Sequence, residues 1–221
     1  MSENSATDQQ PGQDDGNDAP ATDDRCSLLL VRHGQSEWNA VGRWQGQADP
    51  PLTDLGRQQA TAAATKLNTF DAIWASDLQR ARDTAQLIAG ALDVGDVRID
   101  PRLRERDAGL WSGLTRPEIE EQYPGFLDDG RRPDGWEYND KLRERALAAV
   151  VDIVGELGAG GKALVATHGG LIYCLEATLD EEGPRIPNLG ARELLVGPSG
   201  IELGDRYDLL DGAMITESEH P

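Results

Sequence analysis

The stretch Leu28–Asn39, "LLLVRHGQSEWN", decides how the chain is interpreted. Its four leading apolar residues form a short run that is typical of a buried strand. The run ends on Arg32 and His33, and Gly34 follows at once. A glycine lets the backbone turn and approach a ligand closely. The stretch therefore predicts a strand that presents a basic pair at its carboxyl end.

A second strand-like run ends in the same way. Residues 162–167, "KALVAT", are followed by His168 and Gly169. In open α/β sheets, ligands bind just beyond the carboxyl ends of the strands. If the two strands are neighbours, the side chains of His33 and His168 converge there. Each histidine alone fits an ordinary hydrogen-bonded position at a strand end, but two in the same context indicate a site.

Strand-like and helix-like segments alternate along the chain, and Thr53 and Ser76 are predicted helix N-caps. This alternation predicts an α/β fold: a three-layer α/β/α sandwich with a mostly parallel sheet and helices on both faces. The predicted strands are residues 27–31, 72–75, 97–99 and 162–167, with a closing hairpin of 193–196 and 201–203. The predicted helices are residues 54–67, 77–92, 137–157 and 169–179, with a short one between Thr115 and Pro124.

The 221 residues are enough for one domain of ordinary size. Residues 1–24 are acidic and have no large apolar residue beyond Met1, so we expect a disordered tail. A single domain is expected at residues 25–210, followed by a C-terminal tail at 211–221. Neither a signal peptide nor a membrane helix is recognisable, and a cytoplasmic location with no membrane partner is therefore expected.

The composition restricts the partners. The formal net charge is −19, from 40 acidic and 21 basic residues, which argues against nucleic acid and anionic membranes. A local cluster of cations in a cleft can still bind a small anion. The two cysteines have no zinc-site spacing and are expected to be buried and reduced. The run "ARELLVG", residues 191–197, fits an edge strand available for pairing, so a homodimer stays open.

Two further charged residues are candidates for a site. Arg80 falls at the edge of the apolar arc of its predicted helix, near the N-terminus, whereas Arg82 falls outside the arc. A cation is unfavourable at a helix N-terminus unless an anion binds there. The alternative is a stem packed on the core with a solvated head. Glu105, in "LRERDAGLWSG", fits either a site or a surface ion-pair cluster.

Five blocks of the sequence, in order, resemble the histidine phosphatase superfamily, whose members are phosphoglycerate mutase-like. The first carries the signature Arg-His-Gly-x-Ser-x-x-Asn, and the blocks span residues 27–172. They read "LLLVRHGQSEWN", "RWQGQADPPLTDLGRQQA", "ASDLQRARDTA", "LRERDAGLWSGLT" and "ALVATHGGLI". The resemblance implies the phosphoglycerate mutase-like fold and a small phosphorylated metabolite as substrate, with neither a cofactor nor a metal ion.

The resemblance also implies a role for each matching residue. His33 would be the nucleophile that forms a phosphohistidine, and Glu105 would protonate the leaving oxygen and then activate water. Phosphoryl transfer needs cationic donors on the equatorial oxygens, which this residue set supplies. The implied phosphate-holding residues are Arg32, Arg80, His168, Asn39, Gln45 and the backbones of Gly46 and Gly169.

Within this family the sequence favours a phosphatase over a mutase. Family mutases carry a long insertion after the glutamate segment, and the segment between Glu105 and His168 is too short to hold it. Mutase-type phosphotransfer is the alternative. A non-catalytic binder of phosphorylated ligands would be expected to lack Glu105 or a histidine. A metal hydrolase with these side chains as ligands is disfavoured because Arg32 and Arg80 would repel a cation.

The sequence departs from the family pattern at one place. Phosphatases of this group often have Gly-Glu-Ser before the long helix, whereas this chain has Gly135-Trp136-Glu137-Tyr138. Trp136 and Tyr138 either form a wall at the mouth of the cleft or pack the start of the helix. The sequence does not choose between these, and the identity of the substrate stays open with them.

Overall fold

The apolar run Leu28–Val31 lies in strand β1, Cys26–Arg32, inside a six-stranded sheet. The structure is a computed structural model, and it describes residues 1, 24–179, 181 and 183–216. The strand order is β3-β2-β4-β1-β5-β6. The other strands are β2 (Ala72–Ala75), β3 (Arg98–Ile99), β4 (Lys162–Thr167), β5 (Gly190–Gly197) and β6 (Gly200–Asp208).

The sheet is mostly parallel, as the alternation of segments predicts. β3, β2, β4 and β1 pair in parallel, whereas β5 joins β1 and β6 joins β5 in antiparallel fashion. The hairpin of β5 and β6 is longer than predicted and lies beside β1. The expectation that residues 191–197 form an edge strand is wrong, because β5 is paired on both sides and β6 is the edge.

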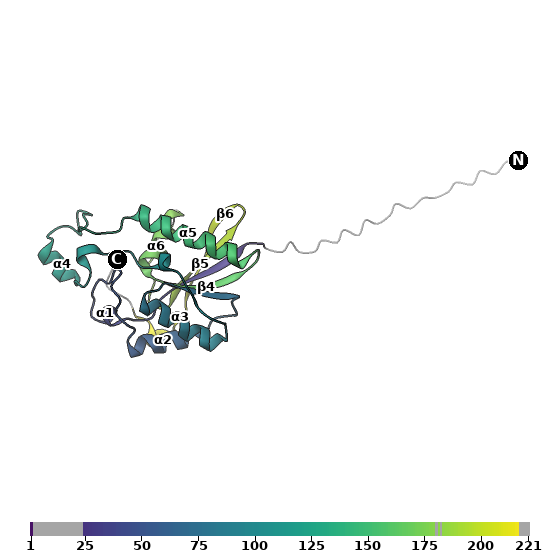
Figure 1. The fold of residues 1–221 in the computed structure, drawn as a ribbon, viewed down its shortest axis with the longest axis horizontal. Coiled ribbons are helices and arrows are strands. Elements are labelled where there is room, and N and C mark those ends of the chain that lie inside the picture. Colours follow the sequence, from purple (N-terminus) through teal and green to yellow (C-terminus); the bar gives the residue numbers. More distant parts are fainter. Residues whose placement is uncertain (2–23, 180, 182, 217–221) are drawn as a thin grey trace.

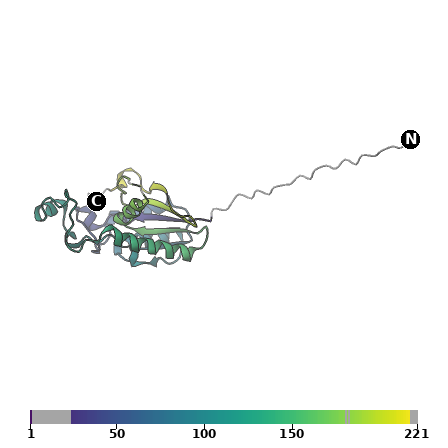
Figure 2. The ribbon, with the colours of Figure 1, turned by 90° about the horizontal axis from the view of Figure 1, so that it is seen from above.

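Helices cover both faces of the sheet, which gives the predicted three layers (Figure 1 and Figure 2). On one face lie α2 (Asp54–Ala64) and α3 (Gln79–Leu92), and on the other lie α5 (Asn139–Leu157) and α6 (Gly169–Thr178). The short helix α4 (Arg116–Gln122), at the left of Figure 1, lies away from these layers. The remaining short elements are α1 (Glu37–Ala40) and the 3₁₀ turns at Pro101–Leu103, Gly109–Trp111 and Gly212–Met214.

The apolar run of β1 is uninterrupted because both faces of the strand are buried. Leu28 and Leu30 lie in the core under α5 and α6, whereas Leu29 and Val31 lie in the core under α2 and α3. Successive side chains of a strand point to opposite faces, so a strand between two helical layers needs apolar residues at every position. The same alternation directs Arg32 to the side of α6 and His33 to the side of α3.

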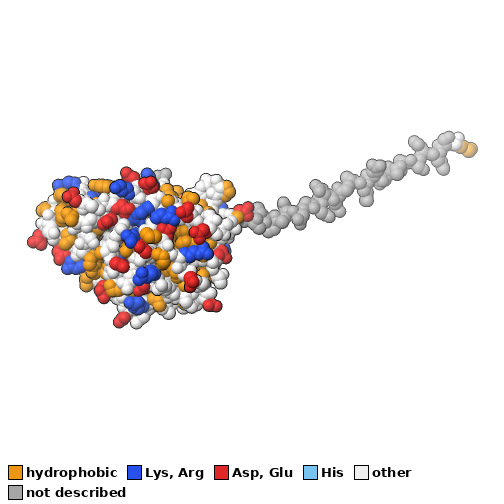
Figure 3. Space-filling view, in the orientation of Figure 1, with side chains coloured by type: hydrophobic (Ala, Val, Ile, Leu, Met, Phe, Trp, Pro, Cys, Tyr) orange, Lys and Arg blue, Asp and Glu red, His pale blue; other side chains and the backbone are white. Residues whose placement is uncertain are grey.

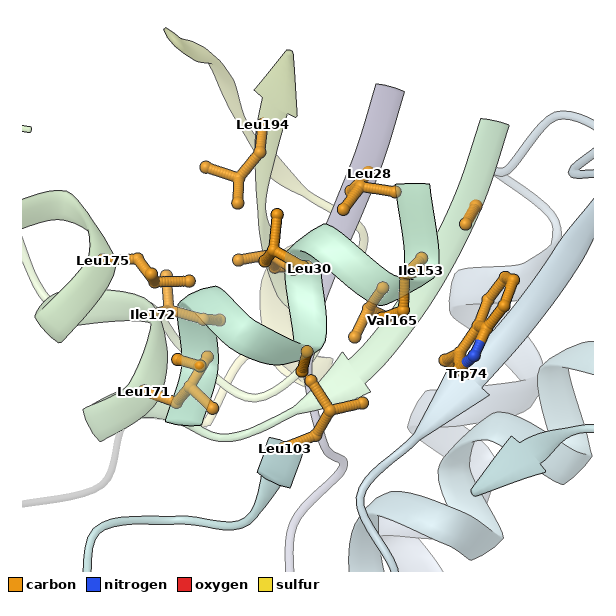
Figure 4. Packing of buried hydrophobic residues seen from close by; sticks show 14 of the residues in the cluster. Leu28, Leu30, Trp74, Leu103, Ile153, Val165, Leu171, Ile172, Leu175 and Leu194 are labelled. Carbon is orange, nitrogen blue, oxygen red and sulfur yellow. The ribbon is translucent and has the colours of Figure 1, made fainter. Parts of the chain in front are cut away.

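The core on the α5 and α6 side packs β1 and β4 against α6 (Figure 4). Leu30 of β1 and Val165 of β4 pack with Leu171 and Leu175 of α6, and all four are nearly fully buried. Full burial of one such side chain contributes about 1.5–3 kcal/mol. Because α6 begins directly after His168, this packing holds that residue beside the end of β1.

A separate aromatic cluster joins α4 to the loops near the end of the sheet. Trp44, Trp111 and Ile119 are buried there, and Trp136 packs against both tryptophans. The Trp44 and Trp111 rings meet edge to face, with centroids 5.3 Å apart. Such aromatic pairs contribute roughly 0.5–1.5 kcal/mol beyond the area that they bury.

Two features near the helix ends differ from the sequence expectations. Ser76 is not an N-cap: its hydroxyl accepts a hydrogen bond from the Leu78 amide, and α3 begins later, at Gln79. The Gln79 amide is capped by the Asp49 carboxylate, which is distant in sequence. α2 ends at Ala64 rather than at residue 67. A cap supplied by a remote loop cannot be identified from the local sequence.

The structure describes part of the expected C-terminal tail but little of the expected N-terminal tail. Of the tail expected at residues 1–24, residues 2–23 lie outside the described residues. At the other end, residues 211–216 pack against the domain, where Gln59 donates hydrogen bonds to the Met214 carbonyl and the Thr216 hydroxyl. The described fold therefore extends to Thr216, beyond the expected boundary at 210, and residues 217–221 lie outside the described part.

Candidate active site

The ends of β1 and β4 bring the two histidines together. Arg32 pairs with Thr167 in the sheet register, and the His33 amide donates to the Thr167 carbonyl at 3.0 Å. The rings of His33 and His168 lie with their centroids 5.1 Å apart. The convergence that the sequence made conditional on neighbouring strands therefore occurs.

The neighbours of His33 select one neutral tautomer. Its Nδ1 lies 2.7 Å from the Gly34 carbonyl oxygen, which can only accept, so Nδ1 carries the proton. The Nε of Arg80, which can only donate, lies 3.2 Å from Nε2, so Nε2 presents a lone pair. Burial, and then the charges of Arg80 and Arg32, hold the pKa of His33 well below its ordinary value. The imidazole is therefore neutral near pH 7.

Arg80 is fully buried in the first turn of α3. Besides facing His33, its guanidinium donates to the carbonyls of Ala48 at 2.7 Å and Gly46 at 2.9 Å. Burial lowers its pKa to about 10, so the group stays charged at neutral pH. The sequence alternative of a solvated head group is thereby excluded. Arg82 keeps its side chain 39% exposed and ion-paired with Asp83.

His168 is fully buried, and neither ring nitrogen has a hydrogen-bond partner among the described residues. Burial, followed by the charge of Arg80, holds its pKa well below the ordinary value. A buried polar group without a partner is costly, and such groups in native proteins are commonly explained by function. A neutral histidine here keeps one N–H donor and one lone pair that no described residue uses.

Arg32 approaches the start of α6 from β1. Its Nη1 donates to the Ile186 carbonyl at 2.6 Å, and burial lowers the pKa of its guanidinium. A side chain at Gly169, the first residue of α6, would contact the Nε and Cδ of Arg32. Backbone amides at a helix N-terminus attract anions, so this amide and the guanidinium together form a site for negative charge.

Glu105 lies at the same site, held by backbone amides. Its Oε1 accepts from the Arg106 amide at 2.7 Å, and its Oε2 accepts from the Gly170 amide at 3.1 Å. A Cβ at position 170 would overlap the Glu105 carboxylate, so a side chain there would displace the carboxylate from the position in which it is found. The second glycine of "THGG" was the available sequence signal for this contact, but the sequence analysis gave it no role.

The segment that carries Glu105 is fixed from α5 by Arg145. The guanidinium of Arg145 donates to the carbonyls of Arg102, Arg104 and Glu105, at 2.6–2.8 Å. It also forms a two-point ion pair with Glu137, at 2.8 Å for each bond. Glu137 Oε2 accepts from the Asp107 amide as well, and the Arg145 ion pair lowers the pKa of Glu137 against the effect of burial. The backbone around Glu105 is therefore held by Arg145 through carbonyls up to residue 105, and by Glu137 through the amide of residue 107.

The loop after β1 supplies the remaining predicted residues. Ser36 and Asn39 form a reciprocal capping box at α1, and the Ser36 hydroxyl also donates to Gln45 Oε1 at 2.8 Å. Gly46 has a φ of 49°, and a Cβ there would meet the Ala108 amide nitrogen at 2.6 Å. Asn39, Gln45 and Gly46 all line the same cavity as His33.

This cavity has a volume of about 70 Å³ and collects most of the predicted residues. His168 is the exception: it is buried against the His33 ring and does not line the cavity. The predicted residues that do line it are Arg32, His33, Asn39, Gln45, Gly46, Arg80, Glu105 and Gly169. The lining residues to which the sequence analysis gave no role are Trp44, Arg106, Ala108, Gly170 and Tyr173, and Trp136 lines it too.

The arrangement collects three kinds of functional group at one cavity. A neutral imidazole nitrogen faces a small cavity with two buried guanidinium groups beside it. A carboxylate held by two amides lies at the same cavity. These are the parts required to transfer a phosphoryl group through a covalent intermediate.

Residues 28–189 match the family model of the histidine phosphatase superfamily (branch 1). The chain belongs to this superfamily, and its fold is the α/β fold of phosphoglycerate mutase-like proteins.

Named relatives include phosphatases and probable mutases. The chain is 41% identical over 165 residues to a glucosyl-3-phosphoglycerate phosphatase of Mycolicibacterium vanbaalenii, covering 69% of this chain and 73% of the relative. It is 40% identical over 161 residues to a probable phosphoglycerate mutase GpmB of an Enterobacter species, covering 69% and 74%.

A solved structure of a mycobacterial glucosyl-3-phosphoglycerate phosphatase with VO3 superposes with a TM-score of 0.72. It is 32% identical, and the match covers 80% of this chain and 96% of that one. The family and these relatives identify the chain as a phosphatase enzyme.

Proposed function

We propose that this enzyme hydrolyses a small phosphomonoester through a phosphohistidine at His33, without a metal ion. The observation that carries the proposal is the forced tautomer of His33. Its protonated Nδ1 is bound to a carbonyl, and its Nε2 lone pair lies beside the guanidinium of Arg80. A histidine nucleophile requires this state.

In the first step, the Arg80 Nε–H releases its hydrogen bond to His33 Nε2 and turns to a phosphoryl oxygen, and the freed Nε2 lone pair attacks phosphorus. The N–P bond forms as the bond from phosphorus to the ester oxygen breaks. The carboxylic acid form of Glu105 gives its proton to that oxygen, which leaves as an alcohol. Arg32, Arg80 and an N–H of His168 stabilise the charge on the three equatorial oxygens.

In the second step, the Glu105 carboxylate takes a proton from water, and the water oxygen attacks phosphorus. The N–P bond breaks, its electron pair returns to His33 Nε2, and inorganic phosphate leaves. Each turnover therefore consumes one water and restores both His33 and the protonated Glu105. Asn39, Gln45 and the backbone amides of Gly46 and Gly169 help to hold the phosphoryl group throughout.

Mutase-type phosphotransfer is the second candidate, and the probable mutases among the relatives favour it. Hydrolysis is preferred because the chain between Glu105 and His168 is too short for the long insertion of the family mutases. A transfer between two hydroxyls of one substrate requires that water be excluded during the phosphohistidine stage. Release of inorganic phosphate from 3-phosphoglycerate, with less isomer formed than phosphate, supports the proposal; the reverse ratio favours the mutase.

The proposal is tested by following the phosphoenzyme with p-nitrophenyl phosphate. We expect hydrolysis to persist in EDTA, and quenched samples to contain an acid-labile, base-stable phosphoprotein. His33→Ala should abolish both turnover and this phosphoprotein. Turnover in His33→Ala would require another nucleophile, and a strict need for added divalent metal would rule out the proposed chemistry.

A matched control is Arg82→Ala. Arg82 neighbours Arg80 in the chain but is partly exposed and paired with Asp83, so it should keep the wild-type phosphoenzyme level. Loss of the phosphoenzyme in Arg82→Ala would mean that the assay reports folding rather than nucleophile identity.

Location and assembly stay predictions. No helix in the described part of the chain is long and apolar enough to cross a membrane. We propose a cytoplasmic enzyme, which fractionation of cells expressing the full chain would check. The homodimer stays open as well, with β6 rather than β5 as the strand edge available for pairing.

A further inference from the structure

Arg32 is one of the few charged residues that the described part of the chain buries, with only 6% of its surface exposed. Figure 3 shows acidic and basic side chains intermixed over the face that it displays, where solvent surrounds them. A buried guanidinium, in contrast, takes its direction from the groups packed around it. It binds a phosphate well only where its N–H donors point at the phosphate oxygens. The contacts that orient Arg32 are therefore important for the chemistry at this cavity.

One of these contacts is with the backbone of Ile186, in the segment between α6 and β5. Arg32 Nη1 donates to the Ile186 carbonyl oxygen at 2.6 Å. The next residue is Pro187, and a proline restricts the residue before it to an extended conformation. The directions of the Ile186 amide and carbonyl are therefore coupled to each other. A group that holds the amide also restrains the carbonyl to which Arg32 is bound.

Tyr173 of α6 is the group that holds this amide. The Ile186 amide donates to the phenolic oxygen of Tyr173 at 2.7 Å. The tyrosine is half-buried, and it lines the cavity at His33. A Cβ added at Gly169 would lie 3.5 Å from the Tyr173 ring and 3.6 Å from Arg32 Nε. The ring and the guanidinium therefore lie on either side of the first residue of α6.

Other contacts hold the same segment, but at residues beside Ile186. Arg206 donates to the Pro184 carbonyl, and Asn188 donates to the His33 carbonyl. The Ile186 side chain is buried in the core under α5 and α6. These contacts fix the path of the segment, whereas the phenolic oxygen bonds directly to the peptide group that precedes the Ile186 carbonyl. Removing that oxygen should therefore leave the segment folded and loosen the direction of the carbonyl.

We propose that Tyr173 is a positioning residue for Arg32 and acts through the backbone of Ile186. Its phenolic oxygen restrains the amide, the extended conformation before Pro187 restrains the carbonyl, and the carbonyl restrains the guanidinium. This inference rests on the proposed function, in which Arg32 stabilises charge on the equatorial phosphoryl oxygens. That charge develops whichever alcohol leaves. The contribution of Tyr173 should therefore be independent of the leaving group.

The test begins with Tyr173→Phe, which removes the phenolic oxygen and keeps the ring in the cavity wall. We expect kcat/KM to fall by at least about fivefold, and by the same factor for p-nitrophenyl phosphate and for glycerol 3-phosphate. A misplaced Glu105 would instead affect glycerol 3-phosphate far more, because its leaving group needs a proton. Orthovanadate, as an analogue of the transferred phosphoryl group, should inhibit the variant at least about fivefold more weakly.

A double-mutant cycle with Arg32→Gln then tests whether the effect passes through Arg32. In the Arg32→Gln background, Tyr173→Phe should change orthovanadate binding by less than about twofold, because the guanidinium that it positions is absent. Binding is also measured as the rise in unfolding temperature that orthovanadate causes, which requires no turnover. Tyr207→Phe is the matched control, since its phenol bonds to Glu193 and does not line the cavity. It should keep the wild-type constants.

Wild-type kcat/KM and orthovanadate inhibition in Tyr173→Phe would overturn the proposal, and so would the same loss in Tyr207→Phe. An equal loss of orthovanadate binding with and without Arg32 would also overturn it, because Tyr173 would then act on the ligand directly or on the fold in general. A loss confined to glycerol 3-phosphate would assign Tyr173 to Glu105 instead. A wild-type phosphohistidine with no effect of Tyr173→Phe removes only this inference. Absence of any phosphohistidine removes the proposed function, and the orthovanadate cycle still decides whether Tyr173 positions Arg32.

Discussion

At the scale of single residues, the site depends on keeping two histidines neutral. His33 and His168 are both buried beside Arg80, and burial is the larger cause of the lowered pKa in each. The same environment that keeps the Nε2 lone pair of His33 unprotonated makes protonation of the folded protein unfavourable. The attack by His33 that we propose and the sensitivity of the fold to acid would therefore have a common origin.

The lowered pKa values of His33 and His168 predict how stability depends on pH. Each histidine binds a proton in the unfolded chain below about pH 6.5 but not in the folded protein. The unfolded state then binds more protons, so stability is complete above pH 6.5 and is lost as pH falls below it. In this acid range, each histidine should contribute a slope approaching ~1.4 kcal/mol per pH unit.

The measurement is the free energy of unfolding in urea between pH 7.5 and 5.5, for wild type and His168→Gln. We expect the variant to show a smaller decrease across this range, by up to one proton's slope. The comparison depends on the slope rather than on absolute stability, so a loss of packing does not affect it. Parallel curves for the two proteins would contradict the buried neutral state of His168.

At the scale of elements, α5 contributes to the site although it carries none of its predicted residues. Arg145 of α5 binds three carbonyls of the segment around Glu105 and pairs with Glu137. Because α5 packs against the sheet, this network transmits the position of the helix to the Glu105 carboxylate. With Glu105 as the proposed acid, we infer that Arg145 is a positioning residue that acts through Glu105.

We predict that Arg145→Gln impairs the acid role of Glu105. It should reduce kcat for an alkyl phosphate by about tenfold or more, and kcat for p-nitrophenyl phosphate by much less. The nitrophenyl leaving group needs little protonation, so it is insensitive to a misplaced acid. The same pattern is expected for Glu105→Gln.

The comparison of the two substrates separates positioning from general damage. Arg143→Gln, on the same helix, is the matched control and should affect neither substrate, because no hydrogen bond or ion pair of Arg143 is found in the described part of the chain. An equal loss on both substrates in Arg145→Gln would mean that the substitution disturbs the fold. In that case Arg145 would be structural only.

Individual elements show which parts of the fold and of the site the sequence predicts and which parts it does not. Two apolar runs that each end on a histidine and a glycine predicted the central strands and the meeting of His33 with His168. The capping of α3 by Asp49 and the cavity wall of Trp136 required the folded chain. Trp136 does both things that the sequence left open, since it lines the cavity and packs in the aromatic cluster.

At the scale of the whole molecule, the last described residues connect back to His33. The Thr216 hydroxyl donates to Asn188 Oδ1 at 2.9 Å and accepts from Gln59 Nε2 at 2.9 Å. Asn188 in turn donates to the His33 carbonyl at 2.8 Å, and it is almost fully buried. The C-terminal segment thereby helps to hold the backbone just after β1, through Asn188.

We predict that Thr216→Val lowers stability by about 1–3 kcal/mol, because Gln59 and Asn188 each lose a partner in a buried setting. Urea unfolding at pH 7.5 measures the change. Thr61→Val is the matched control, since that exposed hydroxyl bonds only to the Arg57 carbonyl of its own helix, and it should change stability by less than about 0.5 kcal/mol. Equal effects in the two variants would mean that the C-terminal contact contributes nothing specific.

The alternation of side chains along β1 decides which face of the sheet each residue occupies, including those at the site. Arg32 and His33 serve opposite faces of the sheet because their positions differ by one, as do those of Leu30 and Val31. Inserting or deleting one residue within the strand would exchange the faces of every later side chain. Such a change would remove His33 from the site and disrupt both cores at once. The length of β1 is therefore constrained separately from the identity of its residues.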